Sequence, residues 1–201
     1  IIKNYQLKKK TKIISEKDNG IYDALNKGVE FATGDIIGFL HSDDTFAQKN
    51  IISKLSKIFI DESVSGVYGN LKYLKDFEKE VVLRKWISNN YHHLSLKCGW
   101  MPPHPTLFLK KDVYSEFGFF NNAYKISADY DFIIRIFSSN KLKIKFINEF
   151  VTIMKIGGAS NKSLRNILQK MYEDYTIIKK NQIGGIITLL MKNFKKIDQF
   201  F

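Results

Sequence analysis

The first part of the chain alternates between short apolar segments and segments in which apolar residues recur every three or four positions. Residues 12–15 predict a short strand, and residues 21–32 predict an amphipathic helix that Gly34 ends. The apolar run over residues 35–40 predicts a buried strand, and the spacing over residues 51–59 predicts a second amphipathic helix. Strands that alternate with helices in this way are typical of an α/β protein with a mostly parallel sheet.

Further strands and helices are expected along the rest of the chain, without an internal repeat or a low-complexity linker. Short apolar segments predict strands at residues 64–68, 81–85, 107–109, 143–147 and 151–156. Helical spacing predicts helices over residues 112–117 and 128–139 and a long helix that begins at Ser163. Residues 89–105 hold all three prolines and predict an irregular segment, which in a compact domain is usually functional or mobile.

Length and composition fit one domain with an appendage. The chain has 201 residues, 44% of them hydrophobic, which is enough for a sizeable core. We expect a domain over residues 1–160 and a C-terminal helical, basic amphipathic segment over residues 161–201. The single cysteine, Cys98, excludes an internal disulfide and a cysteine-based metal cluster. Since no signal peptide or membrane-spanning stretch is recognisable, the expected location is cytoplasmic.

The charge balance indicates an anionic partner. Lys and Arg number 32 against 20 Asp and Glu, a net charge of +12, which attracts nucleic acid, anionic lipid or phosphorylated substrates. Nucleic acid is the least supported, because lysines are spread over many helix faces and do not interleave with aromatic residues. Residues 179–201 mix apolar residues with lysines, and such a segment can lie peripherally on an anionic membrane surface. Its packing on its own domain is an equally open interpretation.

Two adjacent carboxylates, Asp43 and Asp44, follow the predicted strand at residues 35–40. The carboxyl ends of strands are where open α/β sheets bind ligands. Neighbouring carboxylates supply hard oxygen ligands for Mg²⁺ or Mn²⁺, and such an ion usually shares its coordination with substrate phosphates. Polar residues after a strand are also ordinary turn chemistry, so the pair alone does not decide between the two interpretations.

A third carboxylate, Asp129, begins the predicted helix over residues 128–139. Helical spacing places Asp129 in line with the apolar stripe, whereas Asp131 lies off that stripe and four residues before Arg135, where an exposed ion pair is expected. A carboxylate in a first helical turn is stabilised as the anion and can act as a general base. The alternative is that Asp129 only caps the helix.

Taken together, the motifs resemble family 2 glycosyltransferases, more narrowly the bacterial enzymes that build surface polysaccharides. The resemblance extends over the whole chain. The motifs that carry it, in chain order, are Asn26-Lys27-Gly28, Thr33-Gly34-Asp35, Ser42-Asp43-Asp44, the segment 100–106, Gly118-Phe119-Phe120, Ala128-Asp129-Tyr130, the segment 157–161 and Ser163-Leu164-Arg165-Asn166.

This resemblance implies a GT-A fold and transfer of a sugar, with inversion, from a nucleotide-diphosphate sugar to an acceptor hydroxyl on a saccharide or lipid-linked saccharide. It implies that Asp44 binds a divalent ion, Mg²⁺ or Mn²⁺, and that Asp43 binds the ion or the donor. It also implies that Asp129 is the catalytic base.

The resemblance further places Trp100 and His104 near the acceptor and Arg165 near the donor's pyrophosphate. Packing of Trp100 in the core remains open, as does a solvated role for Arg165.

The chain departs from the family pattern at its start. Relatives begin with a strand, a helix and a second strand that hold the nucleotide, whereas this chain starts near the end of that region, where residues 1–10 resemble the helix just before Ser15-Glu16-Lys17-Asp18. We therefore expect a GT-A fold that is partial at its N-terminus and a chain that alone catalyses poorly. Leu25 replaces an arginine common in relatives, so a donor contact from that position is not carried over. The competing interpretations are a noncatalytic basic binding protein and a scaffold with a degenerate transferase fold.

Overall fold

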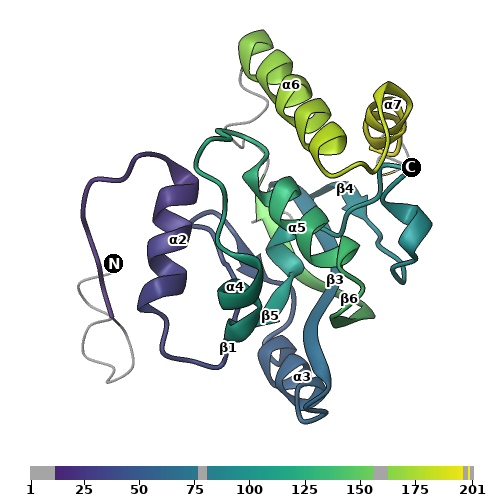
Figure 1. Cartoon of the computed structure of the whole chain (residues 1–201). Helices are drawn as coiled ribbons and strands as arrows, with labels where there is room; N and C mark the ends of the chain where they lie inside the picture. The colour runs from purple at the N-terminus through teal and green to yellow at the C-terminus, as the bar shows by residue number, and fades with distance from the viewer. Residues whose placement is uncertain (1–11, 77–80, 156–162, 197–198, 200–201) are drawn as a thin grey trace.

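The structure is a computed structural model that describes residues 12–76, 81–155, 163–196 and 199 (Figure 1). Residues 1–11, where the chain departs from the family pattern, lie outside the described residues, as do the segment 157–161 of the family resemblance and 197–198 and 200–201 of the tail. The predicted domain boundary at residue 160 therefore stays a prediction. The described helices and strands, in chain order, are α2 (Ile21–Phe31), β1 (Ile36–Ile37), β2 (Thr45–Phe46), α3 (Ile51–Ile58), β3 (Val64–Asp76), β4 (Val81–Trp86), the 3₁₀ turns η1 (His93–Ser95) and η2 (His104–Thr106), β5 (Phe108–Lys110), α4 (Lys111–Phe117), α5 (Ala128–Ser138), β6 (Lys143–Lys155), α6 (Leu164–Lys180) and α7 (Ile186–Phe194).

The molecule is an α/β protein with a mixed sheet, as predicted, but with fewer parallel pairs than expected. The strand order is β1-β5-β3-β6-β2, and β4 pairs with β3 outside this path. Among the described strands only β3 and β6 run parallel. The other pairs are antiparallel. The reason is that no α-helix lies between β3 and β4 or between β3 and β5 in the described chain, so these strands return without the crossover that parallel pairing needs.

Two further strand predictions are corrected. Residues 12–15 form no regular secondary structure, and Ile13 and Ile14 are exposed. An apolar segment becomes a strand only if a neighbour accepts its backbone hydrogen bonds, and none of the described strands does so here. The predicted strand over residues 35–40 is also shorter, because only Ile36–Ile37 pair with β5.

The two strands predicted within residues 143–156 are one strand, β6. Its pairing with β3 shifts register between Tyr68 and Asn70, so that the residues opposite Gly69 bulge rather than end the strand. A Cβ atom at Gly69 would lie 2.7 Å from the Glu149 carbonyl oxygen, so only glycine fits there. The polar residues at this bulge, including Asn148, resemble turn residues in the sequence, which is why two strands were predicted in place of one.

The core lies on both faces of the sheet. Helices α2, α4 and α5 pack in one cluster with Ile37, Tyr68 and Leu109, and α3 packs on the other face with Val67 and Phe108. Adjacent residues of β3 and β5 thus divide between the two clusters, as the alternation of side chains along a strand requires.

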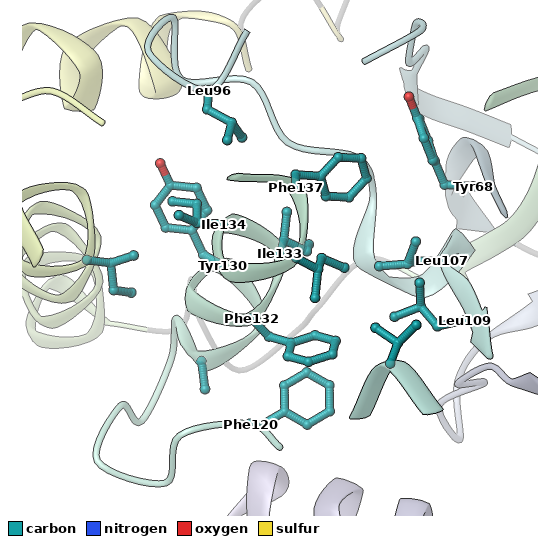
Figure 2. Close-up of a cluster of buried hydrophobic side chains, with 14 of the residues drawn as sticks. Tyr68, Leu96, Leu107, Leu109, Phe120, Tyr130, Phe132, Ile133, Ile134 and Phe137 are labelled. Carbon is teal, nitrogen blue, oxygen red and sulfur yellow. The ribbon is translucent and has the colours of Figure 1, made fainter. Parts of the chain in front are cut away.

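Helix α5 is buried on nearly all sides (Figure 2). Phe132 packs on Phe120, with ring centroids 5.1 Å apart, and Phe137 packs on Tyr68 at 5.8 Å. A helix that is apolar around its circumference is fixed by its surroundings rather than by one face. Asp129 lies in the first turn of α5, so its position is fixed by the packing of this helix.

The expected Asp131–Arg135 ion pair forms, at 2.9 Å, but Asp131 is buried rather than exposed. Its partner Arg135 is also bound to the end of α4 and to the segment that follows it. Arg135 donates hydrogen bonds to the carbonyl oxygens of Phe117 and Phe119 as well as to Asp131. The pair joins α5 to this segment and so has a structural role.

The C-terminal helices pack on the domain. Lys192 of α7 is buried and lies 2.7 Å from Asp174 of α6, which also pairs with Lys170. Burial raises the pKa of Asp174, but the two ammonium groups outweigh it and lower that pKa to about 2. Thr188 of α7 donates to the carbonyl oxygen of Lys97 at 2.9 Å. Over the described part of the tail, α7 packs on the domain, which is one of the two interpretations that the sequence leaves open. In the residues that the structure describes, no helix combines the length and apolarity needed to cross a bilayer.

Candidate functional site

A cavity of about 650 Å³ lies between α2, the first turns of α5 and α6, and the ends of β3, β4 and β6. Its volume is typical of sites for small molecules and cofactors. Three residues predicted from the sequence line it, namely Asp129, His104 and Arg165. They come from three separate parts of the chain, and the fold brings them to the wall of one cavity.

Asp129 is held by a tyrosine of α2. The single proton of the Tyr22 hydroxyl is shared between two acceptors, Asp129 Oδ1 at 3.0 Å and the Ile126 carbonyl oxygen at 2.7 Å. Burial, followed by the charge of Asp129, raises the pKa of Tyr22, so the hydroxyl stays a donor. The N-cap position of α5 is occupied by Ser127, not by Asp129. The carboxylate therefore faces the cavity with one oxygen oriented by Tyr22, and the capping alternative does not describe it.

The segment before Asp129 is fixed from α6. Glu173, which is 2% exposed, accepts hydrogen bonds from the backbone N–H groups of Lys125, Ile126 and Ser127, each at 2.9 Å. The Ser127 side chain makes no capping hydrogen bond, and Glu173 instead fixes the backbone of the three residues that lead into the helix. A carboxylate at a helix N-terminus is also favoured by the helix dipole. Asp129 thus depends on contacts from both α2 and α6.

His104 lies in η2 between aromatic rings. Its ring centroid lies 5.6 Å from that of Phe39, 5.5 Å from that of Phe120 and 6.3 Å from that of His41. Burial lowers the pKa of His104, Asp129 opposes this change, and His41 adds to it. His104 is therefore a neutral imidazole at pH 7, able to donate or accept a hydrogen bond at the cavity wall.

Asp43 and Asp44 follow β1 in a turn closed by a hydrogen bond from Asp44 N to the His41 carbonyl oxygen at 3.0 Å. Asp43 is exposed and accepts from Ser42 Oγ at 2.7 Å. Asp44 is 8% exposed, and its Oδ2 has no hydrogen-bond partner among the described residues. Burial raises the pKa of Asp44, and Asp43 raises it further, against His41. An unpaired buried carboxylate oxygen is costly, and a bound cation would compensate it.

This pair is compatible with a divalent ion that completes its coordination elsewhere. The described residues contain no group of three or more His, Cys, Asp or Glu placed to hold a metal. Mg²⁺ is commonly bound by one or two carboxylates together with water and substrate phosphates. The two aspartates do not line the cavity themselves, but Asp44 and Asp129 both act electrostatically on Tyr73, which does.

The remaining two predicted residues lie in different surroundings. Arg165 is exposed in the first turn of α6 and lines the cavity. Trp100 is 8% exposed and packs against Tyr68, Tyr91 and Phe137, with centroids 5.8, 5.4 and 5.4 Å away. It is absent from the cavity wall. The interpretation of Trp100 as a core residue is the one that the structure supports.

Several site residues were missed in the sequence, chiefly Tyr22, Tyr73 and Glu173. Tyr22 lies on the same face of its helix as Leu25 and Val29, so its spacing predicts that it is buried. A buried tyrosine hydroxyl needs a hydrogen-bond partner, and this could have pointed to a polar contact at the site. Tyr73 lies near the end of a strand that is longer than predicted. Glu173 sits within a long helix, opposite its apolar stripe, and no sequence pattern distinguishes it from a solvated residue.

The sequence is similar to those of known glycosyltransferases. The family model described as Glycosyl transferase family 2 matches residues 1–125. A PGL/p-HBAD biosynthesis glycosyltransferase of Mycobacterium bovis is 28% identical over 148 residues, which cover 73% of this chain and 55% of that protein. An uncharacterized glycosyltransferase of Mycobacterium tuberculosis is 27% identical over 128 residues, 60% of this chain and 45% of that protein. The chain thus spans about half the length of the curated relatives it matches.

Solved structures share the fold. The S. aureus TarS structure in complex with UDP-GlcNAc superposes with a TM-score of 0.62 at 13% identity, over 90% of this chain and 52% of that one. The mannosyltransferase PcManGT from Pyrobaculum calidifontis, in complex with GDP-Man and Mn²⁺, gives 0.56 at 15% identity, over 92% of this chain and 51% of that one. The predicted GT-A fold is confirmed by these likenesses. Because the family model also matches more than half of its residues, this chain belongs to glycosyl transferase family 2.

Proposed function

We propose that this protein transfers a glycosyl group from a nucleotide-diphosphate sugar to an acceptor hydroxyl, with inversion at the anomeric carbon. The observation that carries the proposal is the carboxylate of Asp129, oriented by Tyr22 at the wall of a cavity of about 650 Å³. Family membership supports the reaction class. We also propose a role in the synthesis of bacterial surface polysaccharide, with a saccharide or lipid-linked saccharide as acceptor.

Asp129 acts as the general base. The acceptor hydroxyl attacks the anomeric carbon, its proton passes to a carboxylate oxygen of Asp129, and the bond between that carbon and the diphosphate oxygen breaks. The nucleoside diphosphate leaves on the opposite face, which inverts the configuration. Tyr22 keeps one Asp129 oxygen engaged at 3.0 Å, so the carboxylate is oriented before the acceptor arrives. His104 offers a neutral hydrogen-bonding group to the acceptor or sugar.

The leaving diphosphate is negatively charged, and this charge is balanced by a guanidinium group and by a metal ion that two carboxylates would hold. Arg165 at the cavity wall is placed to bind phosphate oxygens, which guanidinium groups do in a bidentate manner. Asp44 and Asp43 are the residues that would hold Mg²⁺ or Mn²⁺, which when bound neutralises charge on the leaving group. The unpaired buried Oδ2 of Asp44 supports this assignment. The complexes of TarS with UDP-GlcNAc and of PcManGT with GDP-Man support a nucleotide sugar as donor.

Replacing Asp44 is expected to affect binding and stability in opposite directions. Asp44→Ala removes a carboxylate ligand and should weaken Mn²⁺-dependent donor binding at least about tenfold in calorimetric titration. The same change removes an unpaired buried acid, so the thermal unfolding midpoint should stay or rise. Asp35→Ala, at an exposed carboxylate before β1, is the matched control and should leave both values unchanged. Unchanged Mn²⁺-dependent affinity in Asp44→Ala would rule out the metal assignment.

Removing the Tyr22 hydroxyl is expected to slow transfer more than it weakens binding. Tyr22→Phe deletes the donor to Asp129 and should lower kcat about tenfold or more, with the donor KM nearly unchanged. Tyr68→Phe is the matched control, because its buried hydroxyl donates to the Asn89 carbonyl oxygen at 2.7 Å away from Asp129. It should cost comparable stability and leave kcat unchanged. Equal kcat losses in the two variants would show that Tyr22 acts only on stability.

A further inference from the structure

The apolar stripe of α6 faces outward. Its six large members are exposed, by 81% at Leu164, 68% at Leu168 and 69% at Tyr172, and by about 40% at Ile167, Met171 and Tyr175. Glu173, Asp174, Ile177 and Ile178, all in the C-terminal half of the helix, are buried against the domain, and Asp174 and Ile178 continue the line of Ile167 and Met171. An amphipathic helix normally buries its apolar stripe, so this orientation leaves a large apolar surface unpartnered in the described structure.

Helix α7, which contacts α6, also carries exposed apolar side chains. Lys192, Thr188 and Leu189 are buried and attach α7 to the domain, whereas its other apolar side chains are exposed. These are Ile186, Ile187, Leu190, Met191 and Phe194. Figure 1 shows α6 and α7 side by side at one end of the molecule, and the two helices are in contact. We call the exposed apolar residues of these two helices the α6–α7 outer face.

The exposed charged side chains that the structure describes on α6 and α7 have one sign. The two acids of α6 are both turned inward, where Glu173 binds backbone N–H groups and Asp174 pairs with lysines. Helix α7 contains no acid. Arg165, Lys179 and Lys195 are exposed on or beside the outer face. In the part of α6 and α7 that the structure describes, the exposed apolar side chains are accompanied by exposed cations and by no exposed acid. Such a face complements a surface that is apolar beneath a layer of negative charge, which is the cytoplasmic face of a bilayer with anionic lipid.

The outer face adjoins the cavity. Arg165, Asn166 and Gln169 of α6 line the cavity, and the exposed Leu164 and Leu168 lie on the same two turns. A surface that held the outer face would therefore lie next to the cavity wall formed by α6.

We propose that the α6–α7 outer face docks on a bilayer containing anionic lipid, with its apolar side chains at the level of the headgroups. This docking places the cavity beside the membrane, where a lipid-linked acceptor would be presented. The statement about the acceptor rests on the proposed function, but the docking does not.

The test is flotation of the full chain with vesicles in a density gradient, without donor or metal. Vesicles of equal parts phosphatidylcholine and phosphatidylglycerol are compared with vesicles of phosphatidylcholine alone. The chain should float with the first and much less with the second. Leu168→Glu combined with Leu190→Glu should reduce the bound fraction at least about tenfold. Both side chains are exposed, so folding should be retained, which circular dichroism checks.

The matched control is Ile60→Glu. Ile60 is 77% exposed just after α3, at the opposite end of the molecule, and this change should leave flotation unchanged (Figure 1). Lys179→Glu with Lys195→Glu should lower binding to the anionic vesicles about fivefold per lysine. The proposal is overturned if the chain does not float with anionic vesicles, or if Leu168→Glu with Leu190→Glu floats as the parent does. A dimer in sedimentation velocity that this variant dissociates, without flotation, would instead assign the face to a second copy. Because flotation requires no catalysis, a failure of the proposed transfer reaction leaves this result unaffected.

Discussion

Asp129→Asn is expected to lower kcat about a thousandfold, which corresponds to about 4 kcal/mol of transition-state stabilisation. The asparagine amide has nearly the same shape and can still accept the Tyr22 hydrogen bond through its oxygen, but it cannot take the acceptor's proton. Donor affinity and Mn²⁺ dependence should stay close to the parent values. The measurement is the release of nucleoside diphosphate from the donor, in the longest form of the protein that its gene encodes.

Asp112→Asn is the matched control for this change. Asp112 also lies in the first turn of a helix, α4, but it is exposed and away from the cavity. It should leave kcat and the thermal midpoint unchanged. If Asp129→Asn turned over donor at the parent rate, the base would have to be another residue.

Glu173→Gln is expected to be the most destabilising single-atom change near the cavity. Glu173 Oε2 accepts from Ile126 and Ser127, and Oε1 accepts from Lys125 and from Gln169 Nε2. A glutamine amide nitrogen must face at least one of these donors, which leaves a buried N–H group unpaired. The cost should be about 2–3 kcal/mol, or about 5–10 °C in the thermal midpoint. Since the affected turn carries Asp129, kcat should fall as well.

The kinetic part of this prediction separates positioning from stability. Glu116→Gln, at an exposed glutamate 3.5 Å from Lys141, should change stability by less than about 0.5 kcal/mol and leave kcat unchanged. Below its unfolding transition, Glu173→Gln should still show a lower kcat and a donor KM near that of the parent. A parent-like kcat under those conditions would mean that Glu173 stabilises the fold without positioning Asp129.

Local spacing was sufficient to predict the helices but not the sheet. The periodicity of α2, α3, α5 and α6 is visible in the sequence because each has an apolar stripe over several turns. The strands depend on partners distant in the chain. Strand β6 continues through Asn148 and Glu149 only because Gly69 of β3 leaves room for its bulge, and no local pattern records that contact.

Which side chains are buried depends on contacts between distant parts of the chain, and the spacing of apolar residues does not reveal those contacts. The α6 stripe was correctly recognised as one face of a helix, but that face is exposed, because the inward side is fixed by Glu173 and by the Asp174–Lys192 pair. Asp131 was expected at the surface and is buried, in an ion pair with an Arg135 that also binds the carbonyl oxygens of Phe117 and Phe119. Asp129 and His104 were predicted as site residues from their chemistry and from the family resemblance, and both line the same cavity. Trp100 was assigned to the acceptor by resemblance, and its aromatic neighbours place it in the core.

The most direct test of the central claim is the configuration of the first product that the protein releases from a nucleotide sugar. Proton NMR can follow an α-linked donor, such as UDP-GlcNAc or GDP-mannose, with Mn²⁺ and with water or an added saccharide as acceptor. If Asp129 is the base of an inverting transfer, the β-configured product should appear first, and Asp129→Asn should form almost none. Release of the α-configured product, or the same rate in Asp129→Asn, would contradict the account.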